Sequence, residues 1–190
     1  MSGNDKRELS ARSMKAQTNL NPPSIRPLRA LDIELLGDLY FPWSTKQETV
    51  EKWKRYLEEQ QVGTRIARII EYEDKIVGYG NLLLYSEYAS FKIDNVPEIN
   101  DVWIDDHYRR KGLGTLLLSH LEQSAKQLGY PQIGIGVGLY RDYGPAQRLY
   151  FRLGYKPDGR GISYKHTPVT PGEAYPIDDD LILWLTKHLS

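Results

Sequence analysis

The chain of 190 residues contains no cysteine. This absence excludes disulfide bonds, thiolate metal sites and a cysteine nucleophile. Proteins that work in reducing compartments do without disulfides, so the composition fits a cytoplasmic location. We therefore expect the protein to be cytoplasmic, although the absence of cysteine alone does not require it.

An excess of charge of either sign is also absent. The chain has 25 basic and 25 acidic residues, which gives a formal net charge of zero. Nucleic-acid-binding proteins usually carry a basic surplus, so we expect no nucleic-acid partner. No apolar run approaches the ~20 residues that span a bilayer, and the polar N-terminus has no apolar signal segment. We therefore expect no membrane partner.

Histidine is scarce, and its positions do not suggest metal binding. The four histidines lack the spacing of metal ligands; they are His107, His120, His166 and His188. We interpret all four as structural or surface residues and expect no metal site.

The length of the chain suits one domain with a real hydrophobic core. Hydrophobic residues make up 40% and charged residues 26%, as in ordinary globular proteins. Residues 1–23 are polar and end in two prolines, so we predict a poorly ordered N-terminal tail there. Residues 24–190 are predicted to form a single domain.

Apolar spacing and turn residues predict a mixture of strands and helices. The second helix has two alternative capping boxes at its start, Ser44 with Gln47 or Thr45 with Glu48. The predicted strands are 24–27, 65–71, 76–84, 99–104, 133–139 and 181–186, with a further segment at 155–164. The predicted helices are 30–40, a run ending near 60, 113–128 and one that begins at Pro145. This mixture predicts an α+β fold.

One predicted strand has an unusual face. In residues 133–139 isoleucine, valine and leucine alternate with Gly134, Gly136 and Gly138. Glycine weakens a strand and often marks the close approach of a backbone or a ligand. Two interpretations stay open: tight packing on a helix, or a slot beside the strand.

The segment YRRKGLGTLL, residues 108–117, opens a strongly patterned helix without a side-chain N-cap. The first backbone N–H groups of a helix have no intrahelical acceptor and favour an anion, helped by the helix dipole. Gly112 and Gly114 would let a diphosphate approach the backbone, and Arg109, Arg110 and Lys111 would attract it. A solvated corner is the alternative. The segment is neither a Walker A loop nor a dinucleotide-binding fingerprint, which would need glycine at position 117.

Two segments carry a family resemblance. Residues 102–130 resemble the acetyl-CoA-binding segment of the GCN5-related N-acetyltransferase (GNAT) superfamily, whose signature falls on Arg109, Gly112 and Gly114. A second family segment matches Ala146, Leu149, Tyr150, Gly154 and Tyr155. The specific resemblance covers roughly residues 98–160, and the order of elements extends it to residues 24–190.

The resemblance implies a mixed, strongly bent β-sheet flanked by helices, with its fourth and fifth strands splayed apart. Pantetheine would lie in that splay against the backbone of Val102, Trp103 and Ile104. The pyrophosphate would lie on the amides of Arg110, Lys111, Gly112, Leu113, Gly114 and Thr115. Tyr143 stands where many relatives carry a cofactor-binding asparagine, so we expect it to stack on the cofactor or to hydrogen-bond it.

The implied reaction transfers acetyl from acetyl-CoA to an amine. Without cysteine, direct attack in a ternary complex is the expected route. The resemblance implies Glu98 as the base that deprotonates the amine, Tyr150 as the acid that protonates the thiolate, and a backbone amide near Ile104 for the oxyanion. Asp101, Glu87 or a water chain are alternative bases, and Glu98 could instead be an exposed structural carboxylate. A non-catalytic acyl-CoA-binding or regulatory module is the alternative function.

The acceptor is expected to be a small-molecule amine or a peptide or protein amine. The family shapes its acceptor site with three loop regions, which here contain Tyr40, Phe41 and Trp43; Tyr85, Glu87, Tyr88 and Phe91; and residues 165–180. An aromatic rim with carboxylates would suit a cationic amine. The same aromatic residues could equally belong to the core or to an interface. Homodimers are common in the superfamily, so a homodimer is a possible partner state.

Overall fold

A mixed sheet of eight strands runs through the protein. The computed structural model describes residues 22–189, so residues 1–21 of the predicted tail lie outside the described part. The strand order is β1-β2-β3-β4-β5-β8-β6-β7. The bounds are β1 Ser24–Pro27, β2 Arg65–Tyr72, β3 Lys75–Leu83, β4 Glu98–Ile104, β5 Gln132–Gly138, β6 Lys156–Tyr164, β7 Thr167–Pro168 and β8 Leu181–His188. Only β4 and β5 pair in parallel among these strands, and the predicted α+β class is confirmed.

The helices begin where side-chain chemistry favours them. Their bounds are α1 Asp32–Gly37, α2 Lys46–Gln61, α3 Ala89–Ile93, α4 Leu113–Gln127 and α5 Gly144–Arg152. The Thr45 hydroxyl accepts from the Glu48 N–H, and the Glu48 carboxylate accepts from the Thr45 N–H. This reciprocal capping box confirms the second of the two predicted alternatives.

Two helices differ from their predictions. Helix α1 is shorter than the predicted 30–40, because Asp32 accepts from the N–H of Arg29 and from the Arg26 guanidinium. Those bonds stabilise a turn at residues 29–32, so the helix begins only at Asp32. The short helix α3 was not predicted, since five residues contain too little periodicity to identify.

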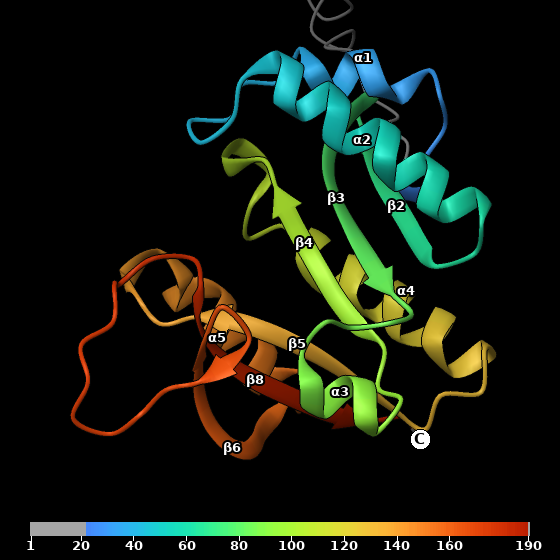
Figure 1. Cartoon of the computed structure of the whole chain (residues 1–190). Coiled ribbons are helices and arrows are strands. Elements are labelled where there is room, and N and C mark those ends of the chain that lie inside the picture. The colour runs from blue at the N-terminus through green and yellow to red at the C-terminus, as the bar shows by residue number, and fades with distance from the viewer. Residues whose placement is uncertain (1–21, 190) are drawn as a thin grey trace, which may run out of the picture.

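Helices cover both faces of the half of the sheet that contains β1 to β4 (Figure 1). On one face Trp53 of α2 is fully buried against Ile69 and Tyr79. On the other face Leu117 and Leu121 of α4 are fully buried in the main core. Full burial of one such leucine contributes roughly 1.5–3 kcal/mol. Leu128, which we predicted on the apolar face of α4, follows the last helical residue and is 53% exposed.

The predicted splay of the fourth and fifth strands is present. Strands β4 and β5 pair only at their first residues, Glu98 with Gly134 and Ile99 with Ile135. Beyond Ile99 the two strands diverge, as Figure 1 shows. Strand β5 instead pairs along its whole length with β8. The sheet is therefore divided into two halves that remain joined at the start of β4.

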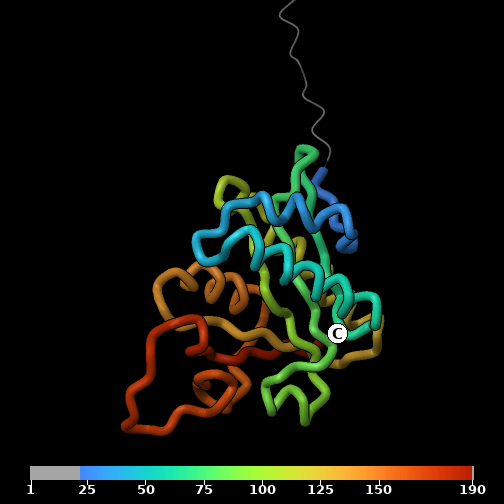
Figure 2. Tube along the Cα trace, turned by 45° about the horizontal axis from the view of Figure 1, so that its top comes forward, coloured from blue at the N-terminus to red at the C-terminus, as the bar shows by residue number. Residues whose placement is uncertain are grey.

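The connection between β7 and β8, residues 169–180, projects from the half of the molecule that contains β5, β8 and β6. In Figures 1 and 2 it runs out as a long red loop, away from α1 and α2. Its last residues return to the start of β8 at Leu181. This return brings the end of the loop back to the region where β4 and β5 diverge.

The glycine face of β5 makes room for aromatic side chains. A Cβ at Gly134 would lie 2.1 Å from the Phe91 ring of α3, and one at Gly138 would lie 2.5 Å from the Tyr143 ring. At Gly136 a Cβ would lie 3.0 Å from Trp184. Tight packing on a helix therefore holds for Gly134, whose partner Phe91 belongs to α3. Gly136 and Gly138 also line a cavity beside the strand, as the second interpretation had it.

Gly134→Ala should lower the free energy of unfolding by about 1–3 kcal/mol, because the added methyl overlaps the Phe91 ring. Urea denaturation measures this change. Phe91→Leu should also destabilise, yet the double variant should be more stable than the sum of the two losses predicts. Strictly additive losses would show that the Phe91 ring is not what excludes the methyl.

Candidate active site

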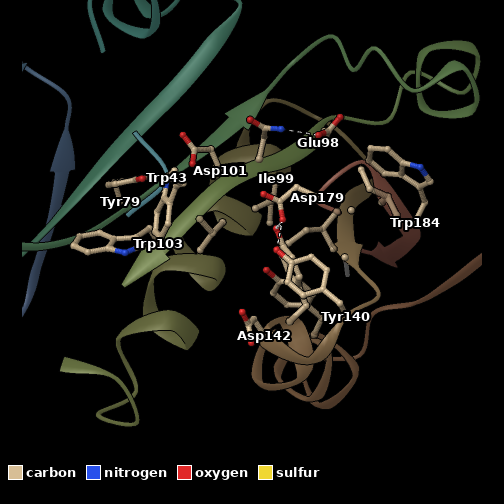
Figure 3. A pocket seen from close by; sticks show the side chains of 18 of the residues that line it. Trp43, Tyr79, Glu98, Ile99, Asp101, Trp103, Tyr140, Asp142, Asp179 and Trp184 are labelled. Carbon is tan, nitrogen blue, oxygen red and sulfur yellow. Dashed lines mark hydrogen bonds between the residues drawn. The ribbon is translucent and has the colours of Figure 1, made fainter. Parts of the chain in front are cut away.

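A cavity of about 480 Å³ lies where β4 and β5 diverge, with an aromatic wall and several carboxylates (Figure 3). Strands β4, β5 and β8, the turn before α5 and α5 itself contribute to its wall. The aromatic residues that line it are Trp43, Tyr79, Trp103, Tyr140, Tyr143, Tyr150 and Trp184. The carboxylates are Glu98, Asp101, Asp142 and Asp179. The cavity therefore combines flat apolar surface with an excess of negative charge.

The cavity brings together six of the predicted site residues. They are Glu98, Val102, Trp103, Arg109, Tyr143 and Tyr150. The other predicted residues do not line it: Ile104, Arg110, Lys111, Gly112, Leu113, Gly114 and Thr115 lie at the end of β4 and around the start of α4. Leu113 points its side chain into the core, where it is 3% exposed. Its predicted role depends on its backbone amide alone.

A β-bulge shapes the β4 wall of the cavity. Asn100 pairs with Asn81 and Trp103 with Tyr79, so two residues, Asp101 and Val102, lie opposite one residue of β3. Asp101 adopts a left-handed φ of 48°. A bulge leaves backbone groups without partners in the ladder. It therefore makes backbone hydrogen-bonding groups available at the mouth of the splay.

Glu98 is a buried carboxylate with two hydrogen-bond donors. It is 5% exposed, so the interpretation as an exposed carboxylate is wrong. The Ser86 hydroxyl donates to Glu98 Oε2 at 2.5 Å, and the Asn100 amide donates to Oε1 at 2.9 Å. These two bonds fix the orientation of the carboxylate. A dashed line in Figure 3 marks a hydrogen bond to Glu98.

The two alternative bases are placed less favourably. Asp101 forms an ion pair with Lys52 of α2, with Oδ2 and Nζ 3.0 Å apart. The Lys52 ammonium also lies over the rings of Trp53 and Tyr79, 5.3 and 5.2 Å from their centroids. Glu87 is exposed and does not line the cavity. Of the three carboxylates, Glu98 alone combines burial, orientation and a place in the wall.

Tyr150 presents an unpaired hydroxyl to the cavity. The side chain is 8% exposed, and burial raises its pKa to about 12. Within residues 22–189 its hydroxyl has no protein hydrogen-bond partner. A phenol in this state keeps its proton at neutral pH, and the proton is not committed to another protein group.

The start of α4 has no side-chain cap. Gly112 is the N-cap residue, with φ 83° and ψ −4°. Within residues 22–189 no protein acceptor receives a hydrogen bond from the backbone N–H groups of residues 110–115. Arg109 Nε donates to the Ile104 carbonyl at 3.0 Å, and a terminal nitrogen of its guanidinium pairs with Asp106 at 2.7 Å. The sequence prediction of an uncapped helix start is therefore confirmed.

The comparison with known proteins agrees with this geometry. The sequence model of the acetyltransferase (GNAT) family matches residues 28–155. The chain belongs to this family. It is 29% identical over 159 residues to the phosphinothricin N-acetyltransferase of Streptomyces viridochromogenes, a match that covers 76% of this chain and 81% of that protein.

Two solved structures show the same fold as this GNAT protein. The yncA protein of Salmonella typhimurium, solved with its cofactor acetyl-CoA, has a TM-score of 0.62 at 19% identity, over 90% of this chain and 95% of its own. An aminoglycoside 6'-N-acetyltransferase complexed with coenzyme A has a TM-score of 0.64 at 17% identity, over 88% and 97%. At these identities the likeness shows the fold alone.

Several residues of the GNAT cavity were not predicted. Tyr140, Asp142, Asp179 and Trp184 line it, and so does His166, which we had interpreted only as a structural or surface residue. His166 is exposed, and its ring centroid lies 5.7 Å from that of Trp184. Residues 165–180 belong to the predicted acceptor region, but nothing in the local sequence pattern distinguishes Asp179 from its neighbours.

The predicted aromatic rim is only partly correct for this GNAT protein. Trp43 is 65% exposed and lines the cavity. Tyr88 and Phe91 instead pack against Trp184 in a small buried cluster, as the alternative interpretation had it. Tyr40 and Tyr85 are exposed and do not line the cavity.

In residues 22–189 of the GNAT protein, no group of three or more histidine, aspartate or glutamate side chains could hold a metal ion. No helix in the same range is long and apolar enough to cross a membrane.

Proposed function

We propose that the protein is an acetyl-CoA-dependent N-acetyltransferase that acts on an amine acceptor by direct attack in a ternary complex. The observation that carries this proposal is the shared cavity: a buried, oriented carboxylate and a protonated phenol face it from different elements. A non-catalytic binding module would need neither group in that place.

The free backbone amides at the start of α4 suit the pyrophosphate of acetyl-CoA. A Cβ built on Gly112 meets no atom within 4 Å, so the space above the free amides is open. The amides of residues 110–115 would hold the pyrophosphate, and Arg109, Arg110 and Lys111 would attract its charge. Val102, Trp103 and Ile104 would hold the pantetheine arm through their backbone. Acetyl-CoA, when bound, supplies an acetyl group on a thioester that an amine can attack.

The side chains of the cavity divide the proton transfers between them. A primary alkyl ammonium has a pKa near 10.4, so the acceptor needs a base at neutral pH. Glu98 would take that proton directly or through one water. Backbone N–H groups beside the bulge would stabilise the oxyanion that develops on the carbonyl. Tyr150 would donate its proton to the departing thiolate.

The composition of the cavity wall favours a cationic acceptor. Glu98, Asp101, Asp142 and Asp179 line it, whereas its one arginine, Arg109, is already paired with Asp106. An anionic acceptor would meet like charge on several sides. Phosphinothricin and aminoglycosides, which the names of two relatives give as acceptors, are two probes for deciding which kind of charge the site accepts.

A thiol-release screen with acetyl-CoA and a panel of amines tests the proposal. The panel should contain alkyl amines, an aminoglycoside, phosphinothricin, and peptides with a free N-terminus or a lysine. Calorimetry with CoA should show binding alongside turnover. Binding of CoA without turnover of any amine would instead support the non-catalytic module.

Gly112→Leu should weaken CoA binding by about tenfold to hundredfold, because the new side chain would enter the space in front of the free amides. Gly63→Leu is the matched control. Gly63 has a φ of 78°, no neighbour within 4 Å of a Cβ, and no place in the cavity. Both variants carry the same left-handed strain, so equal thermal stability with unequal CoA affinity is expected. Equal affinities in calorimetry would show that the pyrophosphate binds elsewhere.

A further inference from the structure

One carboxylate of the cavity is held by two phenols. The hydroxyls of Tyr140 and Tyr143 both donate to Asp179 Oδ1, with a distance of 3.0 Å for Tyr143. Asp179 belongs to the connection between β7 and β8, whereas the tyrosines lie in the turn before α5. In Figure 3 the Asp179 side chain lies between the Trp103 and Trp184 ends of the cavity. The two bonds tether the end of the long loop across the cavity wall.

The two phenols are themselves fixed. Their rings meet edge to face, with centroids 5.0 Å apart, and the Tyr143 ring lies directly on Gly138. Burial raises the pKa of Tyr143, and the bond to Asp179 raises that of Tyr140 to about 12. Both hydroxyls therefore keep at neutral pH the protons that they donate to Asp179.

This arrangement leaves the second oxygen of Asp179 available. Both tyrosines bind Oδ1, and within residues 22–189 Asp179 Oδ2 has no hydrogen-bond or ion-pair partner. The nearby cations are paired with other carboxylates. Arg109, which lines the cavity, pairs with Asp106, and Lys52 of α2 pairs with Asp101. Asp179 is exposed, so this positioned carboxylate oxygen in the cavity wall is accessible to an ammonium group of a ligand.

We propose that Asp179 is a specificity-determining residue that binds a second ammonium group of the acceptor, so that the preferred acceptors are alkyl diamines or longer polyamines. The proposal rests on the proposed function, because it assigns the non-reacting end of an amine that is acetylated in the same cavity. The exposed ring of Trp43, which also lines the cavity, would pack along the alkyl chain.

The acetyl transfer uses one amine of the acceptor and leaves the second amine charged. A C–N bond forms between the neutral amine and the acetyl carbon, the C–S bond of the thioester breaks, and the amine proton passes to the thiolate. The reacting nitrogen becomes a neutral amide. The second ammonium keeps its charge throughout, so its contact with Asp179 contributes to binding of the substrate and not to a chemical step.

The ratio of kcat/KM for 1,4-diaminobutane to that for n-butylamine tests the proposal. The two probes have the same carbon chain and differ in the second amine. The wild-type ratio should be about two- to fivefold, because an ion pair with an exposed carboxylate contributes modestly to binding. Asp179→Asn should bring the ratio close to one, mainly through KM. Asp180→Asn, which removes a charge from the same loop outside the cavity wall, should preserve the ratio.

Calorimetry of 1,4-diaminobutane with the CoA-bound protein gives a second readout that does not depend on turnover. Binding should weaken in Asp179→Asn and persist in Asp180→Asn. Two results would overturn the inference: equal kcat/KM for both amines in the wild type, or the same loss in both variants. If the wild type acetylates both amines with equal kcat/KM, the proposed acetyltransferase function is still supported. Absence of thiol release with every amine would instead defeat the proposed function, and the inference with it.

Discussion

Glu98→Gln should lower kcat by about 10²–10⁴-fold with every amine acceptor, the usual contribution of a positioned general base. Glutamine keeps the shape of the side chain and fills the same buried space. It removes the negative charge that would take the proton of the acceptor. CoA binding should stay unchanged, because Glu98 is the first residue of β4, whereas the start of α4 follows the other end of that strand.

The pH dependence separates loss of a base from loss of packing. If Glu98 removes the proton, the activity of Glu98→Gln should rise with pH toward the amine pKa near 10.4, since the free amine then needs no base. A variant that is merely misfolded would show no such recovery. Glu87→Gln is the matched control, because Glu87 is an exposed carboxylate outside the cavity wall. A wild-type kcat in Glu98→Gln would remove Glu98 from the mechanism.

The sequence predicted those elements that depend on interactions between residues close together in the chain. The capping box at Thr45, the apolar face of α4 and the stop at Gly129 each depend on residues within a few positions of one another. The uncapped start at Gly112 could be predicted in the same way, because the absence of a capping side chain is visible in the sequence. The splay of β4 and β5 was expected from the family resemblance, and periodicity did not indicate it.

Features that depend on contacts between distant segments could not be predicted from the sequence. No glycine or proline in β4 marks the bulge at Asp101, which is visible only in the pairing of β4 with Tyr79 and Asn81 of β3. The burial of Glu98 depends on Ser86 from another segment. Asp179 reaches the cavity through two tyrosines that precede it by 39 and 36 positions. A carboxylate among several in a loop carries no local mark of such a contact.

Tyr150→Phe should lower kcat by about 10²–10³-fold while it leaves CoA affinity nearly unchanged, because the hydroxyl acts on the departing thiolate. Phenylalanine fits the site well. The Tyr150 hydroxyl has no protein partner within residues 22–189, so its removal leaves no buried polar group unsatisfied. The thermal stability of the variant near pH 7 should therefore match that of the wild type. Tyr155→Phe is the control, since Tyr155 lies beside Tyr150 with ring centroids 6.1 Å apart and does not line the cavity.

The raised pKa of Tyr150 gives this prediction a second measurement. A free phenol ionises near pH 10, whereas Tyr150 in the folded protein ionises at about 12. Below its folded pKa Tyr150 keeps its proton. Ionisation of Tyr150 should therefore not lower the wild-type kcat between pH 7 and pH 10. Above pH 10 the unfolded state loses this proton first, so the wild type should lose stability there relative to Tyr150→Phe. A wild-type kcat in Tyr150→Phe would exclude the hydroxyl as the acid, and thiolate protonation would then have to come from water.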